Sequence, residues 1–311
     1  MSSNKLHISK MRPFAFISHW RSLPAYEMIS YVFMYASVPM LAYGINPYDW
    51  LITKIIILTI LSLYCGFFAT LIWNDITDVD IDTIAHPDRP IPSGRMNTRK
   101  FFSIAVLFSI LTFVFAYLIS FWCLVIVGIS ALFVTFHNKY LKKIIKIPAY
   151  SEIFTPLQWV VVPVFGFIAM EGSNLQNMVL LVLFTYFADA AHDLPEGIHD
   201  VDGDRKSGVR TYATSFGEIN AARISFTMLI ISGILGIIIY IRTILTPIFL
   251  IPFICIWGYT IFYSFKLLKI NKSQMHDFSA LVGRKIFNYF LFIYDLIFLD
   301  VLIQLLYNNY L

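Results

Sequence analysis

Apolar runs of about 20 residues recur along the whole chain and limit its fold more than any other feature of the sequence. A run of this length crosses the hydrocarbon core of a bilayer as an α-helix, because lipid offers no partner for unpaired backbone groups. Of the residues, 58% are hydrophobic and 14% are charged, whereas a soluble domain has about 25% charged residues. These values exclude a soluble enzyme, a disordered regulator and a nucleic-acid-binding protein. We therefore predict an all-α, polytopic integral membrane protein.

Hydropathy windows of about 19 residues predict nine transmembrane helices. They lie at 23–45, 51–73, 99–119, 121–137, 150–170, 176–191, 219–240, 243–266 and 284–307. Residues 1–22 then form an N-terminal arm, and 23–311 form a single transmembrane domain. The arm lacks a short apolar core followed by small residues, so we expect no cleaved signal peptide. The three cysteines each lie in an apolar run, which suggests no disulfide framework.

The basic residues predict the orientation of the helices. All of the 23 lysines and arginines except Lys54 and Arg242 lie in the arm, in the loops after helices two, four, six and eight, or at the helix ends beside these loops. By the positive-inside rule these segments are cytoplasmic, and nine spans place the C-terminus on the opposite side. Loops on that opposite side are short, for example Gly44–Asp49. We therefore expect the chemistry of the protein in the membrane or at its cytoplasmic face.

The acidic residues gather in two clusters, which follow helices two and six. The members are Asp75, Asp78, Asp80, Asp82 and Asp88 in the first cluster, and Asp189, Asp193, Glu196, Asp200, Asp202 and Asp204 in the second. Each cluster contains three aspartates at alternate positions, and each follows the second helix in a group of four. This pattern predicts two four-helix repeats of parallel topology, at about 23–140 and 150–266. The helix at 284–307 is then a ninth, unpaired one.

Helical geometry brings the acids of each cluster together. At 100° per residue, Asn74, Asp75, Asp78 and Asp82 share one helix face, while Asp80 points away.

In the second cluster, Asp200 and Asp204 lie one turn apart. Continuing the helix backwards would add Glu196, Asp193 and Asp189 to the same side. Pro195 and Gly197 argue against that continuation, because both residues disfavour a helix interior.

Stacked carboxylates repel one another, so each cluster predicts a bound cation. Oxygen ligands without suitably placed histidine or cysteine favour Mg²⁺ over zinc, and Mg²⁺ commonly bridges carboxylates to phosphates. The basic residues that follow each cluster suit phosphate oxygens. We therefore predict a Mg²⁺-bridged diphosphate. The competing interpretation is a pair of solvated acidic loops, which the repetition of the pattern on one side disfavours.

The residues of the first cluster carry a family resemblance. The string Asn74-Asp75-x-x-Asp78-x-x-x-Asp82, followed by Arg89-Pro-Ile-Pro-Ser-Gly94, resembles the first signature of the UbiA superfamily of intramembrane prenyltransferases. It is most similar to the branch with homogentisate prenyltransferases, chlorophyll synthase and archaeal geranylgeranylglyceryl phosphate prenyltransferase. Asp200-x-x-x-Asp204 resembles the second signature.

The resemblance implies a helical bundle around a central cavity, in which two or more Mg²⁺ ions hold a prenyl diphosphate. The implied metal ligands are Asn74, Asp75, Asp78, Asp82, Asp200 and Asp204. The implied diphosphate-binding residues are Asn74, Arg89, Lys142 and Arg205, with Arg21 of the arm as a further basic residue near the diphosphate.

The first functional hypothesis is Mg²⁺-dependent prenyl transfer. Ionisation of the diphosphate would leave an allylic cation, which a lipophilic or aromatic acceptor captures. Candidate groups for removing the acceptor's proton are Glu196, Asp193, His192 and His199. The partners expected are therefore an isoprenyl diphosphate, this acceptor and the lipid bilayer, without nucleic acid.

Two other hypotheses remain open at this point. A class I terpene cyclase of the same superfamily needs the same metal site and no acceptor, and the segment Leu194–His199 departs from the pattern of the transferases. A transporter could also use intramembrane acids as an ion path. It predicts acids at mid-helix, whereas both clusters lie at helix ends beside basic loops.

Overall fold

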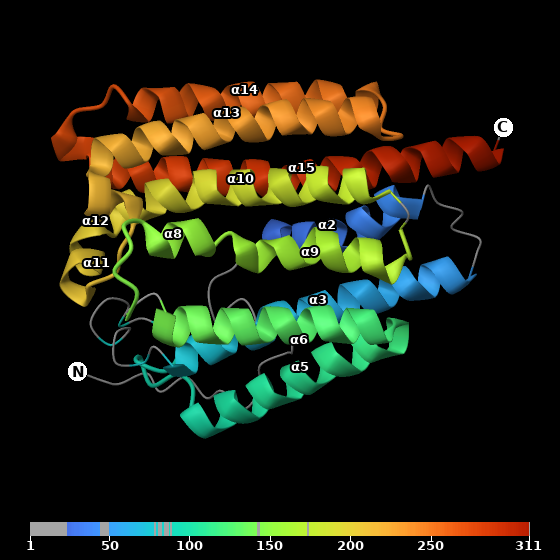
Figure 1. Cartoon of the computed structure of the whole chain (residues 1–311), viewed down its shortest axis with the longest axis horizontal. Coiled ribbons are helices and arrows are strands. Elements are labelled where there is room, and N and C mark those ends of the chain that lie inside the picture. The colour runs from blue at the N-terminus through green and yellow to red at the C-terminus, as the bar shows by residue number, and fades with distance from the viewer. Residues whose placement is uncertain are drawn as a thin grey trace, which may run out of the picture.

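The computed structural model describes residues 24–43, 50–77, 79, 83, 87, 89–141, 144–172 and 174–310, with side chains to 307. Its helices run in alternating directions and form one bundle (Figure 1). They are α2 (Ala25–Tyr43), α3 (Trp50–Thr77), α5 (Thr98–Ile119), α6 (Phe121–Phe136) with a π-helical turn at His137–Leu141, α8 (Tyr150–Phe154), α9 (Leu157–Ala169), α10 (Leu175–His199), α11 (Val201–Ser207), α12 (Tyr212–Phe216), α13 (Glu218–Arg242), α14 (Pro247–Leu267), a 3₁₀ turn at Lys272–Gln274, and α15 (Met275–Tyr310).

Each of the nine predicted spans coincides with helical structure, and the all-α membrane bundle is confirmed. Eight segments of the described chain are long and apolar enough to cross a membrane, beginning at Trp50, Thr98, Phe121, Tyr150, Leu175, Glu218, Pro247 and Lys272. The helix α2 is not among the eight, because it contains Glu27 together with several serines and tyrosines. The chain is thus an integral multi-pass membrane protein. The division into two repeats stays a prediction.

Two predicted boundaries differ from the structure. The sixth helix was expected to end at residue 191, but α10 continues to His199. The ninth was expected to begin at residue 284, but α15 begins at Met275. Polar residues at a membrane face lower the hydropathy of a window without interrupting the backbone hydrogen bonds of the helix.

The bundle has buried central helices and lipid-accessible outer ones. Half of the most apolar window is buried in α10 and in α15, against 17% in α5 and in α6. The helix α10 packs on α9, α13 and α15, while α15 also packs on α2 and α14. Outward positions of the outer helices are apolar, as at Leu107, Ile129 and Ile251. This surface suits lipid rather than water.

A continuous series of aromatic rings fills the space between the central helices. Tyr31 of α2 packs on Phe67 of α3 at 4.4 Å between ring centroids and stacks on Trp159 of α9 at 5.8 Å. Trp159 meets Phe290 of α15 at 5.7 Å, and Phe290 meets Phe287 at 6.3 Å. We call these five residues the aromatic wall.

The short helices α11 and α12 lie together at one end of the bundle, and the C-terminus lies at the other (Figure 1). Thr211 begins α12 with a capping box, in which its hydroxyl accepts the Thr214 N–H and the Thr214 hydroxyl accepts the Thr211 N–H. Gly217 then takes a φ of 87°, a value that suits glycine, and starts α13. This end of the bundle carries the acidic residues of the second cluster.

Candidate active site

The helix α10 carries the first half of the second cluster without a break. Pro195 has no N–H to donate to the carbonyl of Ala191, but that carbonyl accepts the Ser225 hydroxyl of α13 at 2.7 Å. Gly197 faces Glu152 of α8, and a Cβ at this position would collide with Glu152 Oε1. Both residues that argued against a helix are therefore accommodated by tertiary contacts, and the helix ends instead at His199.

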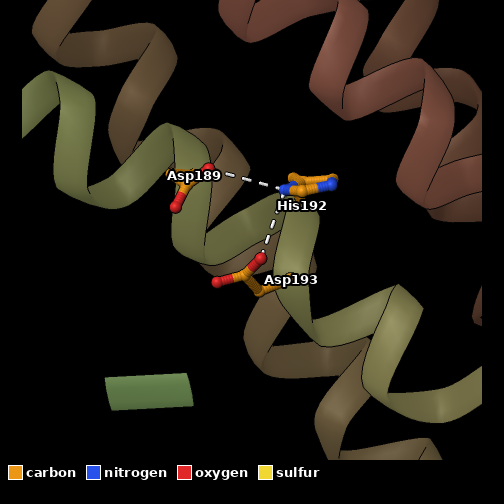
Figure 2. A group of neighbouring side chains, drawn as sticks. All are labelled: Asp189, His192 and Asp193. Atoms are coloured by element: carbon orange, nitrogen blue, oxygen red, sulfur yellow. Dashed lines mark ion pairs between the residues drawn. The ribbon is translucent and has the colours of Figure 1, made fainter. Parts of the chain in front are cut away.

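His192 lies among three carboxylates of α10. Its Nδ1 is 3.3 Å from Asp193 Oδ1 and 3.5 Å from Asp189 Oδ1, as the dashed lines in Figure 2 show. Its Nε2 is 3.0 Å from Glu196 Oε1. The ring packs on Phe287 of the aromatic wall at 4.8 Å between centroids.

This arrangement would pair a protonated His192 with a buried acidic group. An imidazole donates from both nitrogens only when it is protonated, and carboxylates offer only acceptors. The ligand atoms of Asp189, His192 and Asp193 also lie within 4.8 Å of one another, close enough to hold one metal ion. The negative charge of Asp189 and Asp193 would thus be offset either by a protonated His192 or by a cation that a neutral His192 helps to bind.

A cavity of about 200 Å³ adjoins this group and collects most of the second cluster. It lies between α8, α10, α11 and the segment before α12. The residues that line it are Ser151, Glu152, Thr155, Asp193, Glu196, Gly197, Asp200, Asp204, Val209 and Thr211. Asp200 and Asp204 stand one helical turn apart as predicted, since the Asp204 N–H donates to the Asp200 carbonyl at 3.0 Å. We call this space the acidic cavity.

Several carboxylate oxygens at this end are buried without a hydrogen-bond donor in the described part of the chain. Among them are Glu152 Oε1, both oxygens of Asp189, and Asp193 Oδ2. A buried charge is costly unless it is paired. A divalent cation with a preference for oxygen ligands fits this set of donors.

The described members of the first signature lie at the end of α3. Asn74 Oδ1 accepts from Asn138 Nδ2 at 3.4 Å, and Asn138 Oδ1 accepts from Gln158 Nε2 of α9 at 3.3 Å. Asp75 is 1% exposed. Because α9 contacts both α3 and α10, these amides extend from the first signature toward the helix that carries the second. The predicted ligands Asp78 and Asp82 lie outside the described residues.

Of the predicted basic and acceptor-side residues, Arg89, Arg205 and His199 do not line the acidic cavity. Arg205 pairs with Asp202 at 3.4 Å and lines a separate cavity with Lys272. Arg89 begins a turn in which its carbonyl accepts the Ser93 N–H at 3.0 Å. His199 Nδ1 lies 3.1 Å from the carbonyl of His276 in α15. Arg21 and Lys142 lie outside the described residues.

Glu152 is the site residue that sequence reasoning missed. It is 5% exposed, and its Oε2 accepts the Tyr212 N–H at the start of α12. Burial and the adjacent Glu152 carboxylate raise the pKa of the Tyr212 phenol, which therefore stays neutral. A sequence signal was present, since Glu152 is an acid inside a predicted span, and such residues are functional candidates by default.

Comparison with known proteins places these features in a family. Residues 30–289 match the UbiA prenyltransferase family. The digeranylgeranylglyceryl phosphate synthase of Sulfolobus acidocaldarius is 28% identical over 192 residues, which cover 61% of this chain and 66% of that relative. The chain thus spans just under two thirds of the length of this curated relative.

Two solved structures have the same fold. A UbiA homologue from Aeropyrum pernix matches with a TM-score of 0.69 and 19% identity, over 91% of this chain and 99% of that one. A UbiA homologue from Archaeoglobus fulgidus, solved with DMAPP and Mg²⁺ bound, matches with a TM-score of 0.55 and 15% identity, over 87% and 97%. With most of its length matched, this chain belongs to the UbiA prenyltransferase family.

Proposed function

We propose that the protein ionises an isoprenyl diphosphate with the help of Mg²⁺ and transfers the prenyl group to a lipophilic or aromatic acceptor. The observation that carries this proposal is the acidic cavity, where Asp193, Glu196, Asp200 and Asp204 surround about 200 Å³ at one end of an apolar bundle. The Archaeoglobus homologue binds DMAPP and Mg²⁺. This supports the same pairing of ligands here.

The carboxylates of both signatures would hold the metal. On this proposal, Asp200 and Asp204 act from the acidic cavity, and Asn74, Asp75, Asp78 and Asp82 act from the end of α3. Mg²⁺ held by these residues would supply positive charge to stabilise a departing diphosphate. Arg21, Arg89, Lys142 and Arg205 remain the proposed basic partners of its oxygens. Arg205 would have to leave Asp202 to serve in this way.

The aromatic wall supports the second part of the reaction. It begins at Phe287, which packs on His192 beside the acidic cavity, and continues into the bundle through Phe290 and Trp159. Ring faces attract a cation by roughly 0.5–2 kcal/mol each when water is excluded. An allylic cation formed at the cavity would therefore meet stabilising groups and few water molecules on its apolar side.

The proposal also includes the residue that removes the acceptor's proton and the class of acceptor. Glu196 and Asp193 line the acidic cavity and are the better placed candidates for removing the acceptor's proton, while His199 lies against α15. The Sulfolobus relative is named for a glyceryl phosphate product, so a glyceryl phosphate lipid is one acceptor to supply. We also propose that this end of the bundle is cytoplasmic, because the basic loops lie at this end.

The test is an incubation of the detergent-purified protein with Mg²⁺ and geranyl, farnesyl or geranylgeranyl diphosphate. Diphosphate release would be followed with no acceptor, with a geranylgeranylglyceryl phosphate, and with a neutral lipid or aromatic acceptor. We expect little release until an acceptor is added, and a prenylated acceptor as the product. A discrete cyclic hydrocarbon without acceptor would replace transfer by cyclisation. No release with any combination would refute both reactions.

A further inference from the structure

The acidic cavity contains a carboxylate that belongs to neither signature. Glu152 comes from α8, more than 40 residues before Asp200, and lies on the cavity wall opposite α10. One of its oxygens has a structural role, since Oε2 accepts the Tyr212 N–H of α12. The other oxygen, Oε1, is buried and meets no donor in the described residues. Capping of α12 therefore explains the position of only one of the two carboxylate oxygens of Glu152.

Among the described residues, the charged side chains that interact with Glu152 are acidic. Its carboxylate interacts electrostatically with those of Asp204 and Asp193, which line the same cavity. The ion pairs found in the described part of the chain give it no basic partner, and His192 is already surrounded by the acids of its own helix. A buried carboxylate such as that of Glu152, placed beside further carboxylates, is stabilised by a bound cation.

The facing helix is shaped to let Glu152 into the cavity. A Cβ at position 197 would collide with Glu152 Oε1, so the side chain occupies space that only glycine leaves open. Glycine in a helix interior costs about 1 kcal/mol relative to alanine. At Gly197, the turn of α10 that faces Glu152 therefore has a less stable helix but leaves room for the carboxylate.

We propose that Glu152 is a ligand of a divalent cation held in the acidic cavity together with Asp200 and Asp204. The inference rests on the proposed function and adds to it a carboxylate from a different helix. The start of α8, which carries Glu152, is bonded to the segment around α12: the Ser151 N–H donates to the Arg210 carbonyl at 3.0 Å, and the Ala149 N–H donates to Ser215 Oγ at 3.0 Å. A cation bound by Glu152 would therefore also be connected to α12. Because its proposed ligands come from α8, from the junction of α10 and α11, and from α11, cation binding should hold these helices together.

The test is direct Mn²⁺ binding to purified protein by calorimetry, with and without inorganic diphosphate. Glu152→Gln keeps the size of the side chain and an acceptor for the Tyr212 N–H but removes the charge. We expect the Kd for Mn²⁺ to rise by about tenfold or more, the range found when groups around a metal are altered. The matched control is Asp202→Asn, which removes one exposed charge between Asp200 and Asp204 on the same helix. It should change the Kd by less than about twofold, because exposed charges are screened.

Gly197→Ala tests the same carboxylate from the other helix. The added methyl group displaces Glu152 without removing a charge, so Gly197→Ala should also weaken Mn²⁺ binding. This variant replaces Glu152→Gln as the test if Glu152→Gln does not fold. Folding of every variant is checked by thermal unfolding without metal.

Asp200→Asn separates this inference from the proposed function. If Asp200→Asn weakens Mn²⁺ binding and the two variants around Glu152 do not, the role of Glu152 is refuted while the proposed function stands. Equal weakening by Glu152→Gln and Asp202→Asn would refute ligation in favour of a general charge effect. If the wild-type protein binds no Mn²⁺ in either condition, both proposals fail.

Discussion

Asp300 of α15 and Glu152 of α8 are both buried carboxylates, 0% and 5% exposed. Asp300 bonds to the start of α14 and Glu152 to the start of α12, and these two helix starts lie toward opposite ends of the bundle (Figure 1). Around Asp300 every oxygen has donors: Oδ2 accepts the N–H groups of Thr246 and Phe249, and Oδ1 accepts Thr246 Oγ1 and Gln304 Nε2. Asp300 thereby caps the start of α14. Around Glu152, one oxygen lacks any described donor and the other acids of the cavity stand close by.

The difference shows that burial of an acid in a membrane helix does not by itself mark a reactive site. A carboxylate surrounded by fixed donors is satisfied by the fold and stabilises it. A carboxylate grouped with other carboxylates is satisfied only when a cation arrives. The comparison therefore predicts that substitutions at one end lower stability, while substitutions at the other end lower turnover.

The largest effect is expected for Asp200→Ala. Loss of a metal ligand should slow diphosphate release at least about 100-fold, equal to roughly 3 kcal/mol of transition-state stabilisation. The thermal unfolding midpoint in detergent should stay close to that of the wild type, because the side chain lies at the cavity and not in the apolar core. Turnover near the wild-type rate with Mg²⁺ present would show that the acids of the acidic cavity are not needed for the reaction.

Asp300→Ala should show the opposite behaviour. It removes a charged acceptor from the donors that start α14, so the free energy of unfolding should fall by about 2–4 kcal/mol. Diphosphate release at a temperature where the variant remains folded should change by less than about twofold. Asp277→Ala, an exposed acid in the first turn of the same helix, is the control. Thermal unfolding and release assays on both variants measure the contrast, and a specific loss of turnover in Asp300→Ala would contradict it.

Ser225→Ala tests the support for Pro195 and should have a smaller effect. Without the Ser225 hydroxyl the carbonyl of Ala191 loses its donor, and the free energy of unfolding should fall by about 1–2 kcal/mol. Thr227→Ala on the same helix is the control, since Thr227 is exposed and bonds only to Arg223 of its own helix. Equal thermal midpoints for the two variants would show that the proline does not need this contact.

The smallest effect is expected for Asp202→Asn. Asp202 belongs to the second acidic cluster in sequence, but it pairs with Arg205, and its side chain is 74% exposed. The rate of diphosphate release should remain within about twofold of the wild-type rate. The free energy of unfolding should remain within about 0.5 kcal/mol of the wild-type value. A loss comparable with that of Asp200→Ala would show that the cavity wall extends farther along α11.

Much of the fold could be predicted from the sequence, because the signals were local. Each apolar run formed a helix near its predicted place, and Asp200 and Asp204 stand one turn apart as their spacing requires. The end of α10 was mispredicted. Pro195 and Gly197 are unfavourable in an isolated helix, and their acceptance depends on Ser225 and Glu152, which come from other helices.

The sequence by itself determined the membrane-spanning helices and the presence of two acidic clusters at helix ends, since hydropathy and helical spacing are properties of neighbouring residues. Only the tertiary structure decided which acids share a cavity, that His192 lies among three of them, that Arg205 pairs with Asp202, and that Glu152 enters from α8. The physical reason is that electrostatic satisfaction depends on distance in space. Whether a buried carboxylate caps a helix, as Asp300 does, or awaits a cation depends on the donors that packing brings within hydrogen-bonding distance.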